Sequence, residues 1–276
     1  MKGILRLTAA TAALILVFAG TAGAGTRLIL ASTTSTQNSG LFNVLIPAYY
    51  HWTKLKDVRI DVVALGTGKA IATAQRGDAD LLLVHDKDKE MKFLHAGYGI
   101  DRRDVMYNDF VIIGPPDDPA KVKSAKSAAD AFRRIAASGA VFVSRGDQSG
   151  TNARELKMWK AADVDASKLG HYLSIGQGMG ATLKMADEKA AYTLSDRGTY
   201  LAFKDGLKGV TMLYSGDPAL FNQYGTMPVN PARFPSAHYK EAMDFINFIT
   251  GPAGQKVIGD YKDRHGNRLF VPDAGK

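Results

Sequence analysis

Cysteine is absent from this chain of 276 residues. Its absence excludes disulfide bonds, thiolate metal sites, a cysteine nucleophile and a lipid anchor on an N-terminal cysteine. Beyond the N-terminus, no apolar run approaches the roughly 18 residues that a membrane-spanning helix needs. The sequence also lacks a Lys/Arg-rich cluster interleaved with aromatic residues, which argues against nucleic acid as a partner. With 46% hydrophobic and 22% charged residues, the composition is that of a globular protein.

The N-terminus has the three regions of a secretory signal peptide. Lys2 and Arg6 are basic, residues 9–19 form an apolar stretch too short for a spanning helix, and Ala22-Gly23-Ala24 fits the A-x-A cleavage rule. We expect residues 1–24 to be removed, which takes away two basic residues and lowers the formal net charge from +8 to +6. The alternative is an uncleaved anchor. Either way the protein is expected to be exported, and with cleavage it is expected to be periplasmic.

Strand and helix patterns alternate along the rest of the chain. The predicted strands are 27–31, 58–65, 80–84, 110–113, 140–144, 190–194 and 210–214. The predicted helices start near 39, 68, 128, 152, 180, 196, 236 and 252, and Ser195 is expected to cap the helix that starts near 196. This alternation indicates an α/β protein with parallel strands, and the length suits two medium-sized lobes. Ligands of open α/β sheets bind beyond the carboxyl ends of strands, next to helix N-termini.

The segment Ser144 to Thr151 joins the predicted strand 140–144 to the predicted helix 152–162. The free N–H groups of a helix N-terminus and the planar donor fork of Arg145 both suit an oxyanion. Ser149, Gly150 and Thr151 would add hydroxyl and backbone donors. The alternative is a structural arginine paired with Asp147. In the anion-site interpretation Asp147 orients Arg145, because a carboxylate would repel the anion.

Two other strand ends carry similar polar residues. Five consecutive hydroxyl residues, Ser32 to Thr36, follow the strand 27–31, and they are either anion donors or a simple helix cap. Gly66-Thr67-Gly68-Lys69 follows the strand 58–65 and is either an anion contact or a tight turn. It is not a phosphate-binding P-loop, because that pattern needs glycine at position 63 and a hydroxyl at position 70, which here are Val63 and Ala70.

Catalysis and metal binding have little support in the sequence. Ser149 lies between residues that faintly resemble the surroundings of a serine nucleophile, but a triad also needs a histidine base and a carboxylate. None of the six histidines stands in a recognisable catalytic motif, and no histidine pair has the helical spacing of a zinc site. A secreted hydrolase that uses Ser149 is therefore a disfavoured alternative, and no metal ligands are expected.

Taken together, the motifs resemble those of the periplasmic tungstate-binding proteins of ABC importers. The resemblance spans nearly the whole chain after residue 24 and depends on the combination of motifs rather than on any one. The hydroxyl run begins with Ser32 where relatives often have threonine, which preserves a donor. The segments that carry it are Ala31–Leu41, Gly66–Ala70, Gly77–Asp80, Leu83–Asp86, Met106–Phe110, Ser144–Thr151, Gly176–Gly180 and Tyr192–Tyr200.

The resemblance implies the fold and the site. It implies a two-lobed type II periplasmic binding protein fold with two crossings between the lobes, near 107–110 and 214–228. The lobes would be 25–108 plus 223–276, and 109–222. The family motifs place tungstate, held through its oxygens with no separate cofactor, against eight residues of the two lobes: Thr33, Thr34, Ser35, Thr67, Arg145, Ser149, Gly150 and Thr151.

The resemblance also implies a role without catalysis. The protein would be a monomeric receptor that delivers the anion to a membrane permease and its ATPase. A molybdate or phosphate receptor of the same fold, or an anion-sensing module, remains an alternative. Phosphate keeps a proton near neutral pH and needs an acceptor, so Asp86 entering the cleft would favour phosphate. Contacts from Gly178, Met179 and Thr193 are left open.

Overall fold

The computed structural model describes residues 25–275, so the predicted signal peptide, 1–24, lies outside the described residues. No helix within the described range is long and apolar enough to cross a membrane. The strands are β1 Thr26–Thr33, β2 Val58–Leu65, β3 Leu81–Val84, β4 Arg103–Gly114, β5 Phe142–Ser144, β6 Tyr172–Ser174, β7 Thr193–Asp196, β8 Thr211–Tyr214, β9 Phe221–Pro228 and β10 Val271–Pro272. The helices are α1 Thr34–Asn38, α2 Phe42–Trp52, α3 Thr67–Gln75, α4 Lys87–His95, α5 Ala128–Ser138, α6 Gly150–Ala161, α7 Met179–Glu188, α8 Arg197–Phe203, α9 Tyr239–Thr250 and α10 Pro252–Asp260.

The α/β class predicted from the sequence is confirmed, but the prediction of parallel strands is only partly right. The main sheet has the order β10-β4-β9-β3-β1-β2. β1 is parallel to β2 and β3, and β5 is parallel to β6. In contrast, β9 is antiparallel to β3 and β4, and β4 is antiparallel to β7, β8 and β10. Strand direction depends on pairing between distant segments, which local periodicity does not encode.

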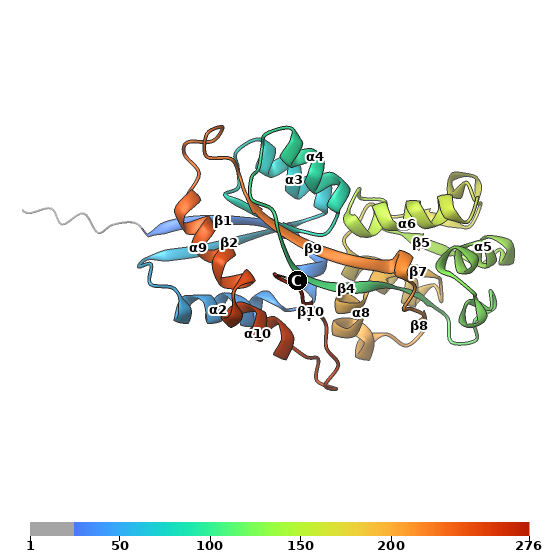
Figure 1. Cartoon of the computed structure of the whole chain (residues 1–276). Coiled ribbons are helices and arrows are strands. Elements are labelled where there is room, and N and C mark those ends of the chain that lie inside the picture. The colour runs from blue at the N-terminus through green and yellow to red at the C-terminus, as the bar shows by residue number, and fades with distance from the viewer. Residues whose placement is uncertain (1–24, 276) are drawn as a thin grey trace, which may run out of the picture.

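Two halves of the molecule are joined by β4 and β9 (Figure 1). We call them the β1 half, with β1 to β3, α1 to α4, α9 and α10, and the β5 half, with β5 to β8, α5 and α6. β4 is long enough to serve both: Arg103 to Asp109 pairs with β9, and Phe110 to Ile113 pairs with β7. The carboxyl ends of β1 and β2 therefore face the loop that follows β5.

Most local elements form where the sequence pattern predicts them. Ser127 caps α5 by accepting a hydrogen bond from the Asp130 N–H, and α3 begins at Thr67. The prediction that Ser195 caps α8 is wrong: β7 continues through Asp196, whose carboxylate accepts from the Thr199 N–H and caps the helix. The short helix α1 was not predicted.

The apolar core consists of separate clusters, of which two are large. In the β5 half, Trp159 packs edge to face on Phe132 and Phe142 with ring centroids 4.6 and 5.0 Å apart, and the two phenylalanine rings are tilted against each other at 5.6 Å. The largest cluster begins at Leu28 and Leu30 in β1 and extends to residues of α7 and α8. α1 contacts both of those helices. Apolar packing thus holds α7 and α8 against the β1 half.

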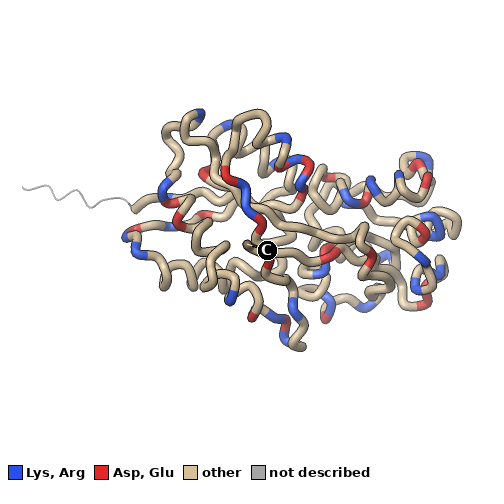
Figure 2. The backbone as a smooth tube through the Cα atoms, in the orientation of Figure 1, with Lys and Arg blue, Asp and Glu red and all other residues tan. Residues whose placement is uncertain are grey.

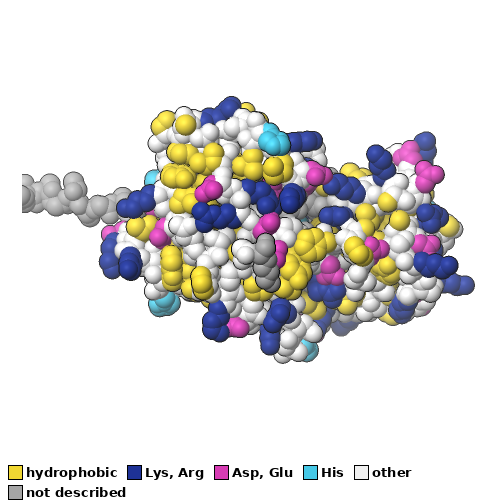
Figure 3. All heavy atoms as spheres, viewed as in Figure 1, with side chains coloured by type: hydrophobic (Ala, Val, Ile, Leu, Met, Phe, Trp, Pro, Cys, Tyr) yellow, Lys and Arg dark blue, Asp and Glu magenta, His cyan; other side chains and the backbone are white. Residues whose placement is uncertain are grey.

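Charged side chains of both signs are interspersed along both halves of the chain (Figure 2). On the face seen in Figure 3, basic and acidic groups lie among hydrophobic side chains over both halves. The formal net charge of the full chain is +8. A charge of this size favours solubility and anionic partners only weakly, so specificity must come from a site.

Candidate anion site

Four helix N-termini lie beside one another between the two halves. Those of α1 and α3 follow β1 and β2, and those of α6 and α7 come from the chain after β5. A Cβ built on Gly178, the N-cap of α7, would lie 3.3 Å from Thr34 Oγ1. A Cβ built on Gly66, the N-cap of α3, would lie 3.2 Å from an Asp147 carboxylate oxygen. These close approaches bring the positive ends of four helix dipoles together.

Two of these helices lack a side-chain cap. Gly66 and Gly178 cap α3 and α7 without a side-chain hydrogen bond. By contrast, Asp86 and Asp196 cap α4 and α8 with carboxylates. The first N–H groups of α3 and α7 therefore have no capping side chain as acceptor, and an oxyanion between the halves can accept hydrogen bonds from them.

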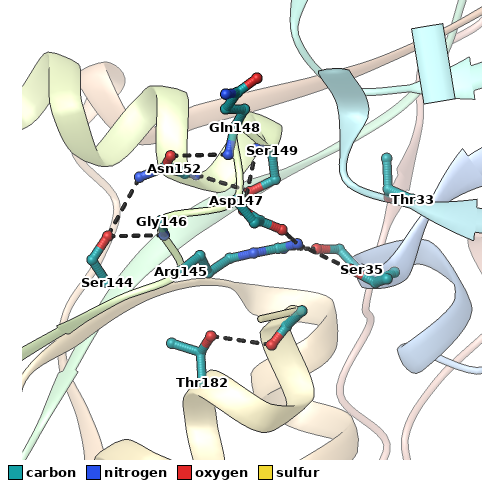
Figure 4. A network of polar contacts seen from close by, with 12 residues as sticks. Thr33, Ser35, Ser144, Arg145, Gly146, Asp147, Gln148, Ser149, Asn152 and Thr182 are labelled. Carbon is teal, nitrogen blue, oxygen red and sulfur yellow. Dashed lines mark hydrogen bonds and ion pairs between the residues drawn. The ribbon is translucent and has the colours of Figure 1, made fainter. Parts of the chain in front are cut away.

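Arg145 crosses between the halves (Figure 4). Its guanidinium is 1% exposed and donates to Ser35 Oγ at 3.2 Å and to Thr34 Oγ1 at 3.1 Å, both in the β1 half. It also forms an ion pair of 2.6 Å with Asp147. The structure thus brings together three residues predicted for the site, and both roles considered for Arg145 are present at once.

Asp147 orients the arginine, as the sequence predicted. Burial by itself would raise the pKa of the Asp147 carboxyl, but the Arg145 charge and hydrogen bonds from Arg145 and Ser149 hold that pKa below its usual value. One carboxylate oxygen accepts from the Ser149 N–H at 3.2 Å. The ionised carboxylate therefore holds the arginine fork and the start of α6 in one geometry.

Two of the predicted hydroxyls are committed to local structure. Thr33 Oγ1 accepts from the Thr36 N–H at 3.2 Å and caps α1. Ser149 Oγ accepts from the Asn152 N–H at 3.2 Å and caps α6. The Ser149 hydroxyl, which accepts from the backbone, keeps its own proton for donation. Thr33 Oγ1 also shares a hydrogen bond of 2.9 Å with Thr36 Oγ1.

Three buried donor atoms at the site have no hydrogen-bond partner within the described residues: Thr67 Oγ1, Thr151 Oγ1 and Arg145 Nε. Each belongs to a residue predicted for the site, and each of these residues is at most 1% exposed. An unpaired buried polar group costs roughly 1–3 kcal/mol. Their chemistry, two hydroxyls and one guanidinium N–H from both halves, fits an acceptor-only ligand such as an oxyanion.

A buried carboxylate supports the site from behind. Glu155 on α6 accepts from Ser144 Oγ at 2.6 Å, Tyr172 OH at 2.7 Å and Trp159 Nε1 at 3.1 Å. Burial raises the pKa of this carboxyl, while its hydrogen bonds lower it. Glu155 thereby ties β5 and β6 to α6 and fixes the loop that carries Arg145.

Asp86 caps α4 by accepting from the Lys89 N–H, and it pairs with the Lys89 ammonium at 3.2 Å. Its side chain also lines a cavity of about 300 Å³ together with His85, Gly150 and Arg154. Its carboxylate is thus already engaged by cationic and N–H donors.

Thr193, whose contact with the anion the sequence left open, is the first residue of β7. Its hydroxyl donates to the Val143 carbonyl at 2.7 Å.

Sequence reasoning did not single out His85 for the site. The residue follows β3, is 4% exposed, and its Nε2 has no partner within the described residues. The backbone of Gly150 contacts its ring, since a Cβ at that glycine would lie 3.0 Å from Nδ1. The only sequence signal is its place at the carboxyl end of an apolar strand.

Comparisons with known proteins identify the family of this chain. A family model described as the PBP superfamily domain matches residues 19–253. The tungstate-binding protein TupA of Peptoclostridium acidaminophilum is 44% identical over 252 residues, which cover 90% of this chain and 86% of that protein. The chain belongs to the PBP superfamily and, within it, to the family of such tungstate-binding relatives.

Two solved structures are similar over most of the chain. The tungstate ABC transporter from Geobacter sulfurreducens has 49% identity and a TM-score of 0.77, covering 85% of this chain and 98% of that one. The tungstate-binding protein TupA from Desulfovibrio alaskensis G20 has 44% identity and a TM-score of 0.75, covering 91% of this chain and all of that one. The family predicted from the motifs is therefore confirmed.

Proposed function

We propose that this protein is a periplasmic receptor that captures tungstate between its two halves and delivers it to an ABC permease. The observation that carries the proposal is a set of buried donors that have no hydrogen-bond partner within residues 25–275: Thr67 Oγ1, Thr151 Oγ1 and Arg145 Nε. They come from both halves, so an anion between them would pair all three. The tungstate-binding relatives named above support the identity of the anion.

The donor set favours an unprotonated dianion. Tungstate carries no proton near neutral pH, whereas phosphate does and needs an acceptor. The nearby carboxylates are already engaged: Asp147 with Arg145 and the Ser149 N–H, and Asp86 with Lys89. This supports tungstate over phosphate. Molybdate has nearly the same size and charge, so these donors do not separate the two.

Capture would proceed by closure. In our proposal the lobes are 25–108 with 223–276, and 109–222, and an anion first bound to Thr34, Ser35 and Thr67 is then enclosed by Arg145 and the start of α6. A cleaved signal peptide would place the protein in the periplasm as a monomer. The partners would be a permease and its ATPase, as in an ABC importer.

No catalytic step is part of the proposal. Ser149 Oγ accepts from the Asn152 N–H, and within residues 25–275 no hydrogen bond joins it to a histidine. A serine nucleophile needs such a base. The hydroxyl instead has the role of a helix cap beside the anion.

Calorimetric titration of the ligand-stripped protein with tungstate, molybdate, phosphate and sulfate tests the function. We expect tight binding of tungstate and weak or absent binding of phosphate. A preference for phosphate would contradict the donor-only site. An absence of binding to all four anions would contradict the receptor function.

A further inference from the structure

His85 has a buried ring nitrogen that the proposed site does not yet use. The ring stacks on Tyr224 with centroids 4.7 Å apart and also lies near Phe110. It follows β3, the strand next to β1 in the sheet, so it lies at the same sheet edge as the hydroxyl run. The residue is 4% exposed, so water does not freely solvate it.

A chain of hydrogen bonds assigns the proton of the neutral ring. His85 Nδ1 is 3.0 Å from Asn222 Oδ1. The Asn222 amide is oriented because its Nδ2 donates to Asn108 Oδ1 at 2.7 Å. Asn108 is oriented in turn, since its Nδ2 donates to the Leu269 carbonyl at 3.3 Å. Nδ1 therefore carries the proton, and Nε2 keeps a lone pair that has no partner within the described residues.

The ring is in contact with the proposed anion site. Gly150 opens α6, and a Cβ added there would lie 3.0 Å from His85 Nδ1 and 3.1 Å from Cε1. The charges of Arg145 and Asp196 both act on the ring. An anion held by Arg145 and the start of α6 would act on the same ring.

The charges around His85 are of both signs. Asp196 at the end of β7 and Asp86 beside the ring are negative; Asp86 is paired with Lys89, and the positive charge of Arg145 is paired with Asp147. Neighbours on β4 and β9 are Phe110, Asn108, Asn222 and Tyr224, and burial keeps the Tyr224 phenol neutral by raising its pKa well above 10. The cavity that His85 also lines adds five charged residues: Lys87, Asp88, Asp104, Arg154 and Lys157.

In this structure His85 is neutral near pH 7. Burial lowers its pKa to about 4; Asp196 and the hydrogen bond to Asn222 oppose that shift, and Arg145 adds to it. A dianion at the site would bring two further negative charges into a poorly solvated region. Negative charge near a histidine favours its protonated form.

We propose that capture of the oxyanion is coupled to the uptake of one proton by His85, whose Nε2 takes that proton from solvent and becomes an N–H donor in the complex. No bond of the anion is made or broken, and charge is balanced because the proton enters with the dianion. The inference rests on the proposed anion-binding function. Proton uptake makes the affinity for the anion depend on pH. Between the pKa of His85 in the free protein and its pKa in the complex, Kd rises about tenfold for each unit of pH increase.

Calorimetry with sodium tungstate in buffers of low and high ionisation enthalpy measures this proton directly. At pH 6.5 to 7 we expect the observed enthalpy to change linearly with buffer ionisation enthalpy, with a slope approaching one proton taken up. His85→Asn keeps a donor for Asn222 and should abolish the slope while weakening binding. His171→Asn is the matched control, because His171 Nε2 is also buried without a partner but precedes β6.

Tight tungstate binding by the wild type with no buffer dependence would overturn proton coupling and leave the receptor function intact. No binding in any buffer would overturn the receptor function itself. If the His85→Asn variant fails to fold, the Kd of the wild type for tungstate, measured from pH 6.5 to 8.5, tests the proposal. A Kd that does not change with pH contradicts it. Tighter binding of phosphate than of tungstate would mean that Nε2 accepts a proton carried by the anion, which also overturns it.

Discussion

Arg145 is a buried cation whose charge is balanced within the protein before any anion arrives. Asp147 neutralises it at 2.6 Å, and the hydroxyls of Thr34 and Ser35 accept from its Nη groups. Its Nε has no hydrogen-bond partner in the part of the chain that the structure describes. The site therefore offers an anion oriented N–H and hydroxyl donors rather than a large excess of positive charge. Such a shell selects by geometry and by protonation state.

Removing this arginine should affect both binding and folding. Arg145→Ala is expected to abolish tight tungstate binding and to lower the unfolding free energy by about 3–5 kcal/mol, because Asp147 would be a buried charge without its partner. Titration calorimetry and chemical denaturation measure the two effects. The double variant Arg145→Ala/Asp147→Ala should recover stability but not binding; recovery of binding would contradict the assignment.

The unpaired hydroxyls should show the opposite signature. Thr67→Val and Thr151→Val are expected to leave the stability of the ligand-free protein unchanged or higher, while each weakens tungstate binding by about 1–3 kcal/mol. The control is Thr226→Val, whose hydroxyl donates to the Leu82 carbonyl at 2.8 Å. It should lower stability by about 1 kcal/mol and leave affinity unchanged. Equal affinity in all three variants would remove both hydroxyls from the site.

His85 should make the ligand-free fold sensitive to acid. Burial lowers the pKa of its ring from the usual 6.5 to about 4 in the fold. Because the fold favours the neutral ring, its contribution to stability is complete above pH 6.5 and is lost as pH falls through 4. The His85→Asn variant should therefore lose about 3 kcal/mol less unfolding free energy than the wild type over this pH range. Denaturation at several pH values measures it; identical pH profiles for the variant and the wild type would contradict the burial argument.

At the scale of the element, glycines determine how closely helix N-termini approach one another. Gly66 and Gly178 leave the first turns of α3 and α7 without side-chain caps. Gly150 allows the first turn of α6 to lie against His85, since a Cβ there would be 2.6 Å from the His85 carbonyl oxygen. A side chain at any of these positions would occupy space between the halves.

Gly150→Ala tests this role of small residues. The added methyl group would push the start of α6 away from β3, and overpacking of this kind costs about 1–3 kcal/mol. We expect a loss of tungstate affinity of similar size in calorimetry. Gly170→Ala is the control, because a Cβ at Gly170 meets nothing within 4 Å. A Gly150→Ala protein with wild-type affinity would show that this contact does not position the site.

At the scale of the whole molecule, polar contacts between the halves accompany the site. Lys157 on α6 pairs with Asp88 on α4 at 2.6 Å, and the Lys89 ammonium donates to the Gln148 carbonyl at 2.8 Å. Such exposed pairs contribute little individually. Closure would therefore depend mainly on the anion and Arg145.

Small-angle scattering tests that dependence. Wild-type protein is expected to become more compact when tungstate is added, because the anion pairs donors from both halves. Arg145→Ala with tungstate should retain the scattering profile of its ligand-free form. A wild-type profile that tungstate does not change would contradict capture by closure.

The α/β class, most strand and helix positions and the polar character of the strand ends could be predicted from the amino-acid sequence alone. These properties follow from local periodicity and from residue types such as glycine and threonine at turns. The family motifs then singled out Arg145 and Thr67, which the structure places among buried donors without partners. Their joint role as an anion site stays a prediction until binding is measured.

Features that depend on contacts between distant segments became visible only in the folded chain. The antiparallel pairing of β9 with β3 and β4, and the capping of α8 by Asp196 instead of Ser195, depend on where β4 and β7 pair. The proposed role of His85 required Asn222, 137 positions away, to assign the proton of the ring. Local sequence carries no signal for such contacts, because their energy comes from burial and hydrogen bonding between segments that meet only in the folded chain.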